Sequence, residues 1–314
     1  MRRLYAGQLP PNSIIKADLE YVSHNWREYG FDAWEEVNGL HFFTAMAQLK
    51  AMEDGSQLAL QFKDDGASGW YDAQRKALIQ FVRRFWDWDK GHLISTLDID
   101  SHRRSGLNCD ILLGALHGDG KTFPPWSNEV LSSMAKFINL METRFPNPSP
   151  PPGDNRRRGV GIGRYMEDVY DGSGSTGGYA WFICTSSVAH VLYSSIEEFI
   201  SKHKFTVTQL NLPFWKLVNP EFEVMEGGGN ESPVFREFNA DDELFNATMA
   251  WMFQYADSFI DVVRLHVTEQ GRMSEQFDTK TGGQRGAKDL TWSYGSFLSA
   301  VEERARARKA LYGE

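Results

Sequence analysis

Hydrophobic residues recur mainly at intervals of three and four positions, which places them on one face of an α-helix. Alternation at every second position, typical of a strand, is scarce. The spacing predicts helices at roughly 12–29, 40–53, 71–88, 107–117, 127–144, 179–202, 240–270 and 287–311, with a shorter one near 206–218. Start signals agree with this, because Asn12 or Ser13 can cap the first helix, Ser127 can cap the fifth, and Asp241 and Asp242 precede the long later one. The pattern therefore predicts an all-α fold.

Three segments interrupt the helical pattern. Residues 145–153 hold five prolines, which remove amide donors and cannot continue a helix. We expect a loop within one domain there rather than a linker, because similar helical segments lie on both sides. Residues 171–178 and 226–230 are rich in glycine and are expected to form surface loops. The sequence thus predicts one domain over residues 1–314.

Composition narrows the range of partners. The formal net charge is −9 and no Lys/Arg block is present, which argues against nucleic acid as a partner. The sequence contains no run of 18 apolar residues that could span a membrane, and residues 1–11 do not resemble a signal peptide. Cys109 and Cys184 allow at most one disulfide, and neither zinc-ligand spacing nor any other metal motif is found. We expect a soluble monomer that needs no metal and no cofactor.

Several familiar motifs fail on spacing. Residues 114–122 resemble a phosphate-binding loop but place five residues between the two glycines where four are required. The glycines of 159–163 have the wrong spacing for a dinucleotide fingerprint and follow three arginines rather than a strand. No serine lies in a Gly-x-Ser-x-Gly elbow. Nucleotide-binding and serine-hydrolase functions are therefore not supported.

Carboxylates lie among aromatic residues in two distant segments. Asp32, Glu35 and Glu36 surround Trp34, and Glu275 stands beside an amide side chain. The first segment has two interpretations. It is either a solvated helix entry with acids near the positive end of the dipole, or an acid whose pKa is raised by packing against an indole. Two separated carboxylates with aromatic walls are what sugar hydrolysis requires.

These residues resemble the glucoamylases of glycoside hydrolase family fifteen, particularly the fungal and yeast-like ones. The resemblance rests on Asp32-Ala-Trp-Glu-Glu-Val-Asn-Gly39, on Gly163-Arg-Tyr-Met-Glu-Asp-Val-Tyr170 with Trp181-Phe182, and on Met273-Ser-Glu-Gln276 with Asp289-Leu-Thr-Trp-Ser-Tyr294. It implies an (α/α)6 toroid, of which about eight of twelve helices are recognisable. It also implies inverting exo-hydrolysis of α-1,4-glucosidic bonds, with glucose released from starch or a related α-glucan.

The resemblance implies a role for each matched residue. Glu35 would be the general acid and Glu275 the base, with their carboxyls roughly 6.5–9.5 Å apart, and Asp32 would support the acid as a catalytic partner. Substrate-binding roles would belong to Trp34, Glu36, Arg164, Asp168, Trp181, Gln276 and Trp292.

The sequence departs from the family in several ways. Nothing matches the Trp-x-Arg-Asp segment that grips the terminal glucose, so we expect that the N-terminal third of the catalytic domain is absent and that no starch-binding domain follows. Tyr29, Met166 and Gly178 also differ from the usual residues. The family implies secretion, although no signal peptide is visible. The alternatives are an inactive remnant that at most binds sugar and, more distantly, a helical scaffold of another toroid family.

Overall fold

A computed structural model describes residues 4–5, 13–97, 104–146, 157–219 and 234–313. Within these residues it contains nine α-helices and a short 3-10 helix at Arg83–Phe85. The α-helices are α1 (Ile14–Asn25), α2 (Phe42–Gln61), α3 (Asp65–Val82), α4 (Asp110–His117), α5 (Asn128–Arg144), α6 (Phe182–Lys202), α7 (Leu212–Val218), α8 (Glu243–His266) and α9 (Thr291–Tyr312). The prediction of an all-α fold is confirmed.

The strands are short and all pair antiparallel. They are β1 (Gly30–Phe31), β2 (Asn38–His41), β3 (Trp86–Asp87), β4 (His92–Leu93), β5 (Thr96–Leu97), β6 (Ala180–Trp181), β7 (Lys204–Thr208), β8 (Val234–Asn239), β9 (Gln276–Phe277) and β10 (Gln284–Arg285). One small sheet has the order β1-β2-β5 and another the order β10-β9-β6, while β3 pairs with β4 and β7 with β8.

Helix boundaries differ from the prediction in the first half of the chain. The helix predicted at 40–53 continues to Gln61, and the one predicted at 71–88 begins at Asp65 and ends at Val82. Glycines in both segments weaken the helical pattern, but packing of α2 against α3 overrides this low propensity. The helix predicted near 206–218 is also partly wrong, because Lys204–Thr208 pairs with β8 and only Leu212–Val218 is helical.

Two of the predicted start signals can be compared directly. The Ser127 hydroxyl accepts a hydrogen bond from the Val130 amide at 3.3 Å, which confirms it as the cap of α5. Asp242 precedes α8, but its carboxylate accepts from the Asn239 amide and makes no side-chain cap bond to the helix. Asn12 and the segments predicted as loops at 147–153 and 226–230 lie outside the described residues.

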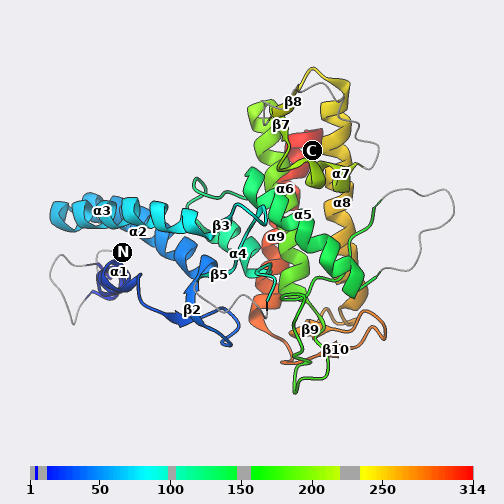
Figure 1. Ribbon diagram of the computed structural model, residues 1–314, viewed down its shortest axis with the longest axis horizontal. Helices are drawn as coiled ribbons and strands as arrows, with labels where there is room; N and C mark the ends of the chain where they lie inside the picture. Colours follow the sequence, from blue (N-terminus) through cyan, green and yellow to red (C-terminus); the bar gives the residue numbers. More distant parts are fainter. Residues whose placement is uncertain (1–3, 6–12, 98–103, 147–156, 220–233, 314) are drawn as a thin grey trace.

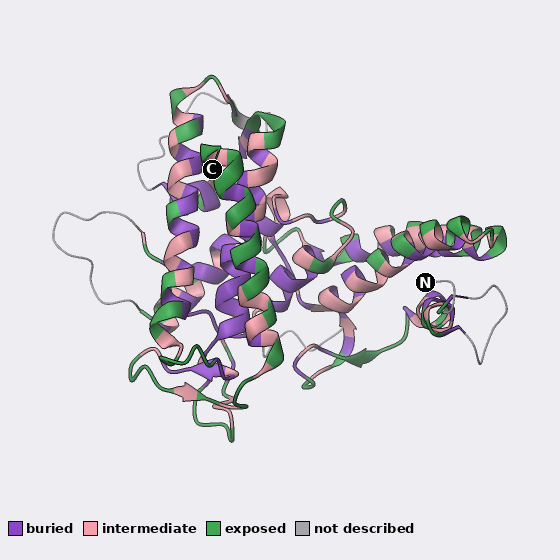
Figure 2. Cartoon of the chain, turned by 180° about the vertical axis from the view of Figure 1, so that it is seen from behind, coloured by how far each residue is buried: buried purple, intermediate pink, exposed green. Residues whose placement is uncertain are grey.

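The long helices α5, α6, α8 and α9 form one bundle, and α2 and α3 project from it side by side (Figure 1). Burial is concentrated along α6, which contacts α9, α8 and α4 (Figure 2). A disulfide joins Cys109, just before α4, to Cys184 in α6. In the part of the chain that is described, no helix is both long enough and apolar enough to cross a bilayer. The strand clusters β1-β2-β5 and β10-β9-β6 hold the candidate site.

Candidate active site

The first carboxylate segment forms a tight turn between β1 and β2, here called the acid loop (residues 32–37). The buried Asp32 carboxylate accepts hydrogen bonds from the amides of Glu36 at 2.7 Å and Val37 at 3.1 Å. The Glu35 amide donates to the Asp32 carbonyl at 3.0 Å, and Glu35 has a φ of 59° in the left-handed region. Because a non-glycine residue takes this conformation at a cost, the hydrogen bonds of Asp32 are needed to hold the turn.

The turn sends neighbouring side chains in different directions. Trp34 is buried, with 7% of its surface exposed, whereas Glu35 is exposed. The structure therefore corrects the interpretation in which the acid is desolvated against the indole. It also corrects the helix-entry interpretation, since α2 begins only at Phe42, after the turn and β2.

Arg164 lies at the centre of the site and is buried. Its Nε and one terminal nitrogen contact the Asp168 carboxylate at 2.8 and 2.7 Å, and the same terminal nitrogen lies 2.7 Å from Glu36. Burial alone would lower the pKa of Arg164, but the Asp168 and Glu36 carboxylates outweigh it and raise the pKa well above its usual range. A permanent cation is thus fixed beside the acid loop.

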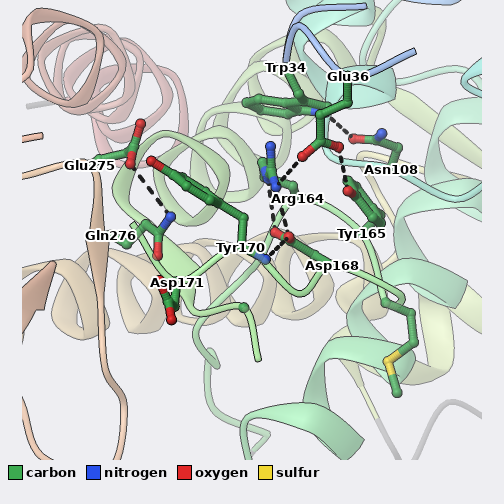
Figure 3. Close-up of polar contacts among 12 residues, drawn as sticks. Trp34, Glu36, Asn108, Arg164, Tyr165, Asp168, Tyr170, Asp171, Glu275 and Gln276 are labelled. Carbon is green, nitrogen blue, oxygen red and sulfur yellow. Dashed lines mark hydrogen bonds and ion pairs between the residues drawn. The ribbon is translucent and has the colours of Figure 1, made fainter. Parts of the chain in front are cut away.

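Two guanidinium groups and one hydroxyl group contact the Glu36 carboxylate. The Tyr165 hydroxyl donates to it, and Arg164 and Arg104 form ion pairs with it, the latter at 3.2 Å. Burial would raise the pKa of Glu36, but the Tyr165 hydrogen bond and the two guanidinium groups outweigh burial and lower the pKa. Glu36 is therefore ionised and has a fixed position (Figure 3).

Three indoles form an aromatic wall behind Arg164. Trp34, Trp181 and Trp292 contact one another, with ring centroids 5.4, 5.9 and 6.0 Å apart. The guanidinium group lies 4.9 Å from the Trp181 ring centroid, within the range of a cation–π contact. The Trp34 indole donates to Asn108 at 3.0 Å. Among the described residues, the buried indole nitrogens of Trp181 and Trp292 make no hydrogen bond.

Glu275 approaches from the other sheet. It precedes β9, where Gln276 pairs with Trp181 of β6, and the Gln276 amide lies 3.5 Å from the Glu275 carboxylate. Burial raises the pKa of Glu275, while a backbone contact from Ala287 and the charge of Arg164 oppose the rise. In Figure 3 the Tyr170 ring lies between Arg164 and Glu275, with its hydroxyl directed toward the Glu275 carboxylate.

Glycines allow the loop around Glu275 to close over it. Gly286 has a φ of 72°, and a Cβ added there would stand 2.2 Å from a Glu275 carboxylate oxygen. Gly172 lies equally close to the backbone of Gly286, because a Cβ added at Gly172 would stand 2.5 Å from the Gly286 nitrogen. Any side chain at these positions would displace the carboxylate or the loop.

The structure brings most of the predicted site residues together. Around Arg164 it gathers Trp34, Glu36, Asp168, Trp181, Trp292, Glu275 and Gln276. Asp32 and Asp168 bind the acid loop and Arg164 respectively, so their carboxylates hold the site together. Sequence reasoning missed Tyr165, Tyr170 and Asn108. The two tyrosines lie within the Gly163–Tyr170 motif and could have been found there, whereas no local pattern marks Asn108.

Separated carboxylates beside aromatic side chains are the groups that the hydrolysis of a sugar requires. The family model for glycosyl hydrolases family 15 matches residues 8–302. The chain therefore belongs to glycoside hydrolase family 15.

Named relatives agree with this assignment. The chain is 30% identical over 310 residues to a glucoamylase of Blastobotrys adeninivorans, covering 96% of the chain and 48% of that relative. It is 33% identical over 318 residues to an intracellular, sporulation-specific glucoamylase of Saccharomyces cerevisiae, covering 96% and 56%. The chain thus spans about half the length of the curated relatives it matches.

Solved structures support the fold. A glucoamylase from Saccharomycopsis fibuligera is similar at a TM-score of 0.84 and 28% identity, over 94% of this chain and 61% of the other. A family 15 glucoamylase from Hypocrea jecorina is similar at a TM-score of 0.80 and 30% identity, over 93% and 46%. The fold is therefore the (α/α)6 toroid of these enzymes in incomplete form, since the described residues contain nine α-helices, fewer than the twelve of a full toroid.

Proposed function

We propose that this chain carries the acid–base centre of an inverting exo-hydrolase that releases glucose from the ends of an α-1,4-glucan. Glu35 would protonate the glycosidic oxygen, and Glu275 would remove a proton from the attacking water. The observation that carries the proposal is the placement of Arg164 between Glu36 and Asp168, beside the indole wall and facing the Glu275 loop. Glucoamylase is also the printed name of the relatives reported above.

The chemistry follows from where the charges lie. A glucan is neutral and rich in hydroxyl groups. An ionised Glu36 and a fixed Arg164 can form charge-assisted hydrogen bonds with these hydroxyl groups, although the substrate itself carries no charge. Trp292 is partly exposed and can offer an apolar face to the sugar ring, while the buried Trp34 and Trp181 pack behind it. Exposure of Glu35 gives the acid access to substrate, and its left-handed turn fixes the direction of its side chain.

The base has its own requirement. Glu275 must be ionised to activate water, and burial raises its pKa, so turnover should fall as the pH drops through that raised pKa. The charge of Arg164 opposes this rise and keeps Glu275 ionised to lower pH than burial alone would allow. Arg164 thus binds substrate and supports the base together.

The domain, location and assembly are part of the proposal. We propose that residues 1–314 form part of one family 15 catalytic domain, that the protein acts as a monomer, and that it is secreted as the family resemblance implies. One relative is named as intracellular, so secretion is not a property of every similar protein.

The alternative is an inactive remnant that binds sugar. It is favoured by the share of the relatives that the chain spans, because about half of the length of those glucoamylases has no counterpart in this chain. Maltose binding without turnover in the unaltered chain would support the remnant.

The test replaces Glu35 and Glu275 singly by Gln, which keeps shape but cannot transfer the proton. Glucose release from maltoheptaose should fall by about 10²–10⁴-fold in each variant, while maltose binding measured by calorimetry should persist. Glu269→Gln is the matched control, because Glu269 is exposed in the same connecting segment. A loss of less than about tenfold in either variant would assign the proton transfer to another residue.

A further inference from the structure

A chain of polar side chains links the start of α4 to the acid loop. Asp110, the first residue of α4, is 0% exposed, and the Ser95 hydroxyl lies 3.0 Å from its Oδ2 atom. The Ser95 and Thr96 hydroxyls are 3.3 Å apart, and the Thr96 hydroxyl lies 2.9 Å from Nδ1 of His41. The chain ends where Nε2 of His41 meets the Gly30 carbonyl at 2.9 Å, on the strand that leads into the acid loop.

A second branch reaches the loop from the other side. The Asp110 amide donates to the side-chain oxygen of Asn108 at 3.1 Å. The same oxygen accepts from the Trp34 indole at 3.0 Å. The carboxyl group of Asp110 is therefore connected through Ser95 to the backbone before the acid loop. Its backbone amide is connected through Asn108 to the Trp34 indole within that loop.

Burial determines the protonation of Asp110. Its Oδ1 atom makes no hydrogen bond in the described part of the chain, and an ionised carboxylate left so would be costly. Burial raises the pKa of Asp110 to about 8, and the Asp32 carboxylate adds to the rise. The Ser95 hydroxyl, the Ile111 backbone and the charge of Arg104 oppose it.

Where α2 and α6 contact α4 and the residues that flank it, the contacting groups include apolar side chains and a disulfide. Gly114 faces Phe42 and Gly118 faces Met46, both of α2, and α6 supplies the disulfide partner of Cys109. The charged groups that shift the pKa of Asp110 are the Asp32 carboxylate, which raises it, and the Arg104 guanidinium, which lowers it.

A proton on Oδ2 gives the whole chain one direction. Asp110 then donates to Ser95, Ser95 to Thr96, Thr96 to Nδ1 of His41, and Nε2–H of His41 to the Gly30 carbonyl. Without that proton, Ser95 must turn its only hydrogen toward Asp110. If Thr96 continues to donate to His41, no hydrogen is left for the contact between Ser95 and Thr96. Loss of one proton therefore breaks the chain at that link and leaves a buried charge near Asp32.

We propose that Asp110 is a positioning residue for the acid loop, in which one retained proton keeps the hydrogen-bond chain to Gly30 continuous. The importance for catalysis rests on the proposed role of Glu35, but the coupling between Asp110 and the loop does not. Asp110 makes no contact with substrate in this proposal and acts only through the loop.

The first experiment measures amide exchange in the 314-residue chain by mass spectrometry, so it needs no activity. After correction for intrinsic rates, a peptide covering residues 30–37 should exchange about tenfold faster at pH 9 than at pH 6. Asp110→Asn should remove this pH dependence, because its amide donates to Ser95 at every pH. Asp89→Asn is the control, since Asp89 is exposed. Equal pH dependence in the unaltered chain and Asp110→Asn would overturn the proposal.

The second experiment follows urea unfolding with pH. A carboxyl whose pKa is raised on folding contributes stability that is complete below its unfolded pKa and is lost as the pH rises through its folded pKa. Stability relative to Asp110→Asn should thus decline between about pH 4 and pH 8. Parallel curves would contradict the proposal.

A second variant covers failure of Asp110→Asn to fold. Ser95→Ala removes the link while Asp110 stays, so residues 30–37 should exchange fast at both pH values. Unchanged slow exchange in Ser95→Ala would also overturn the proposal. If these results hold while Glu35→Gln leaves glucose release unaltered, the proposed function fails and the positioning role of Asp110 stands.

Discussion

Arg164 shows how much one residue organises this site. Its planar group contacts Asp168 through two nitrogens, contacts Glu36, and stacks near Trp181. Lysine carries the same charge but cannot form this fork. The geometry therefore depends on the shape of the side chain as well as on its charge.

Arg164→Lys should lower the free energy of unfolding by about 2–3 kcal/mol, because the buried Asp168 carboxylate loses its two-nitrogen partner. Urea denaturation at pH 6 measures this directly. Arg285→Lys is the matched control, since Arg285 is exposed and should change stability by less than about 0.5 kcal/mol. Equal effects of the two substitutions would show that the pairing with Asp168 contributes little.

Residue identities were easier to predict than their surroundings. The two carboxylate segments and Arg164 stand out in the sequence, and the structure brings them into one region. The exposure of Glu35 could not be predicted, because it depends on a left-handed turn. That turn is held by the Asp32 carboxylate, which accepts a hydrogen bond from the backbone amide of Glu36. The pairing of Asn108 with Trp34 joins residues 74 positions apart and leaves no local signal.

At the scale of elements, long helices with a clear apolar face were predictable and short strands were not. Residues 128–144 and 182–202 fold nearly as their spacing predicts. Pairs of two-residue strands such as β6 and β9 depend on contacts between segments far apart in the chain, so periodicity carries no trace of them. The spacing predicts a helix that overlaps the end of strand β7, because the partner strand β8 lies beyond α7 and leaves no local signal.

The disulfide between Cys109 and Cys184 fastens α4 to α6 across 75 positions of sequence. Closing a loop of that length restricts the unfolded chain, so replacing both cysteines by Ser should cost about 2–4 kcal/mol of stability. Calorimetry should show a lower melting temperature for the double variant. Reductant should lower the melting temperature of the unaltered chain and should not change that of the double variant. A melting temperature unaffected by the double substitution would contradict this.

At the scale of the whole molecule, the site lies where two small sheets meet the ends of the helices (Figure 1). The sheet of β1, β2 and β5 carries the acid loop, and the sheet of β6, β9 and β10 carries Glu275. The relative positions of the Glu35 and Glu275 carboxylates therefore depend on how the α2–α3 pair is placed relative to the bundle of α5, α6, α8 and α9.

The separation of two carboxyls decides whether water can attack from the face opposite the leaving group. An inverting pair leaves room for that water, and glucose released from an α-glucan is then formed as the β-anomer. A retaining pair, about 5–5.5 Å apart, would form the α-anomer through a covalent intermediate. The product therefore reports on the arrangement of Glu35 and Glu275 during turnover.

The most direct test is proton NMR of the first glucose released from maltoheptaose by the 314-residue chain, recorded before the anomers equilibrate. β-Glucose is expected as the first product, with the signal lost in Glu35→Gln and in Glu275→Gln. α-Glucose as the first product, or β-glucose formed at an unchanged rate by either variant, would contradict it.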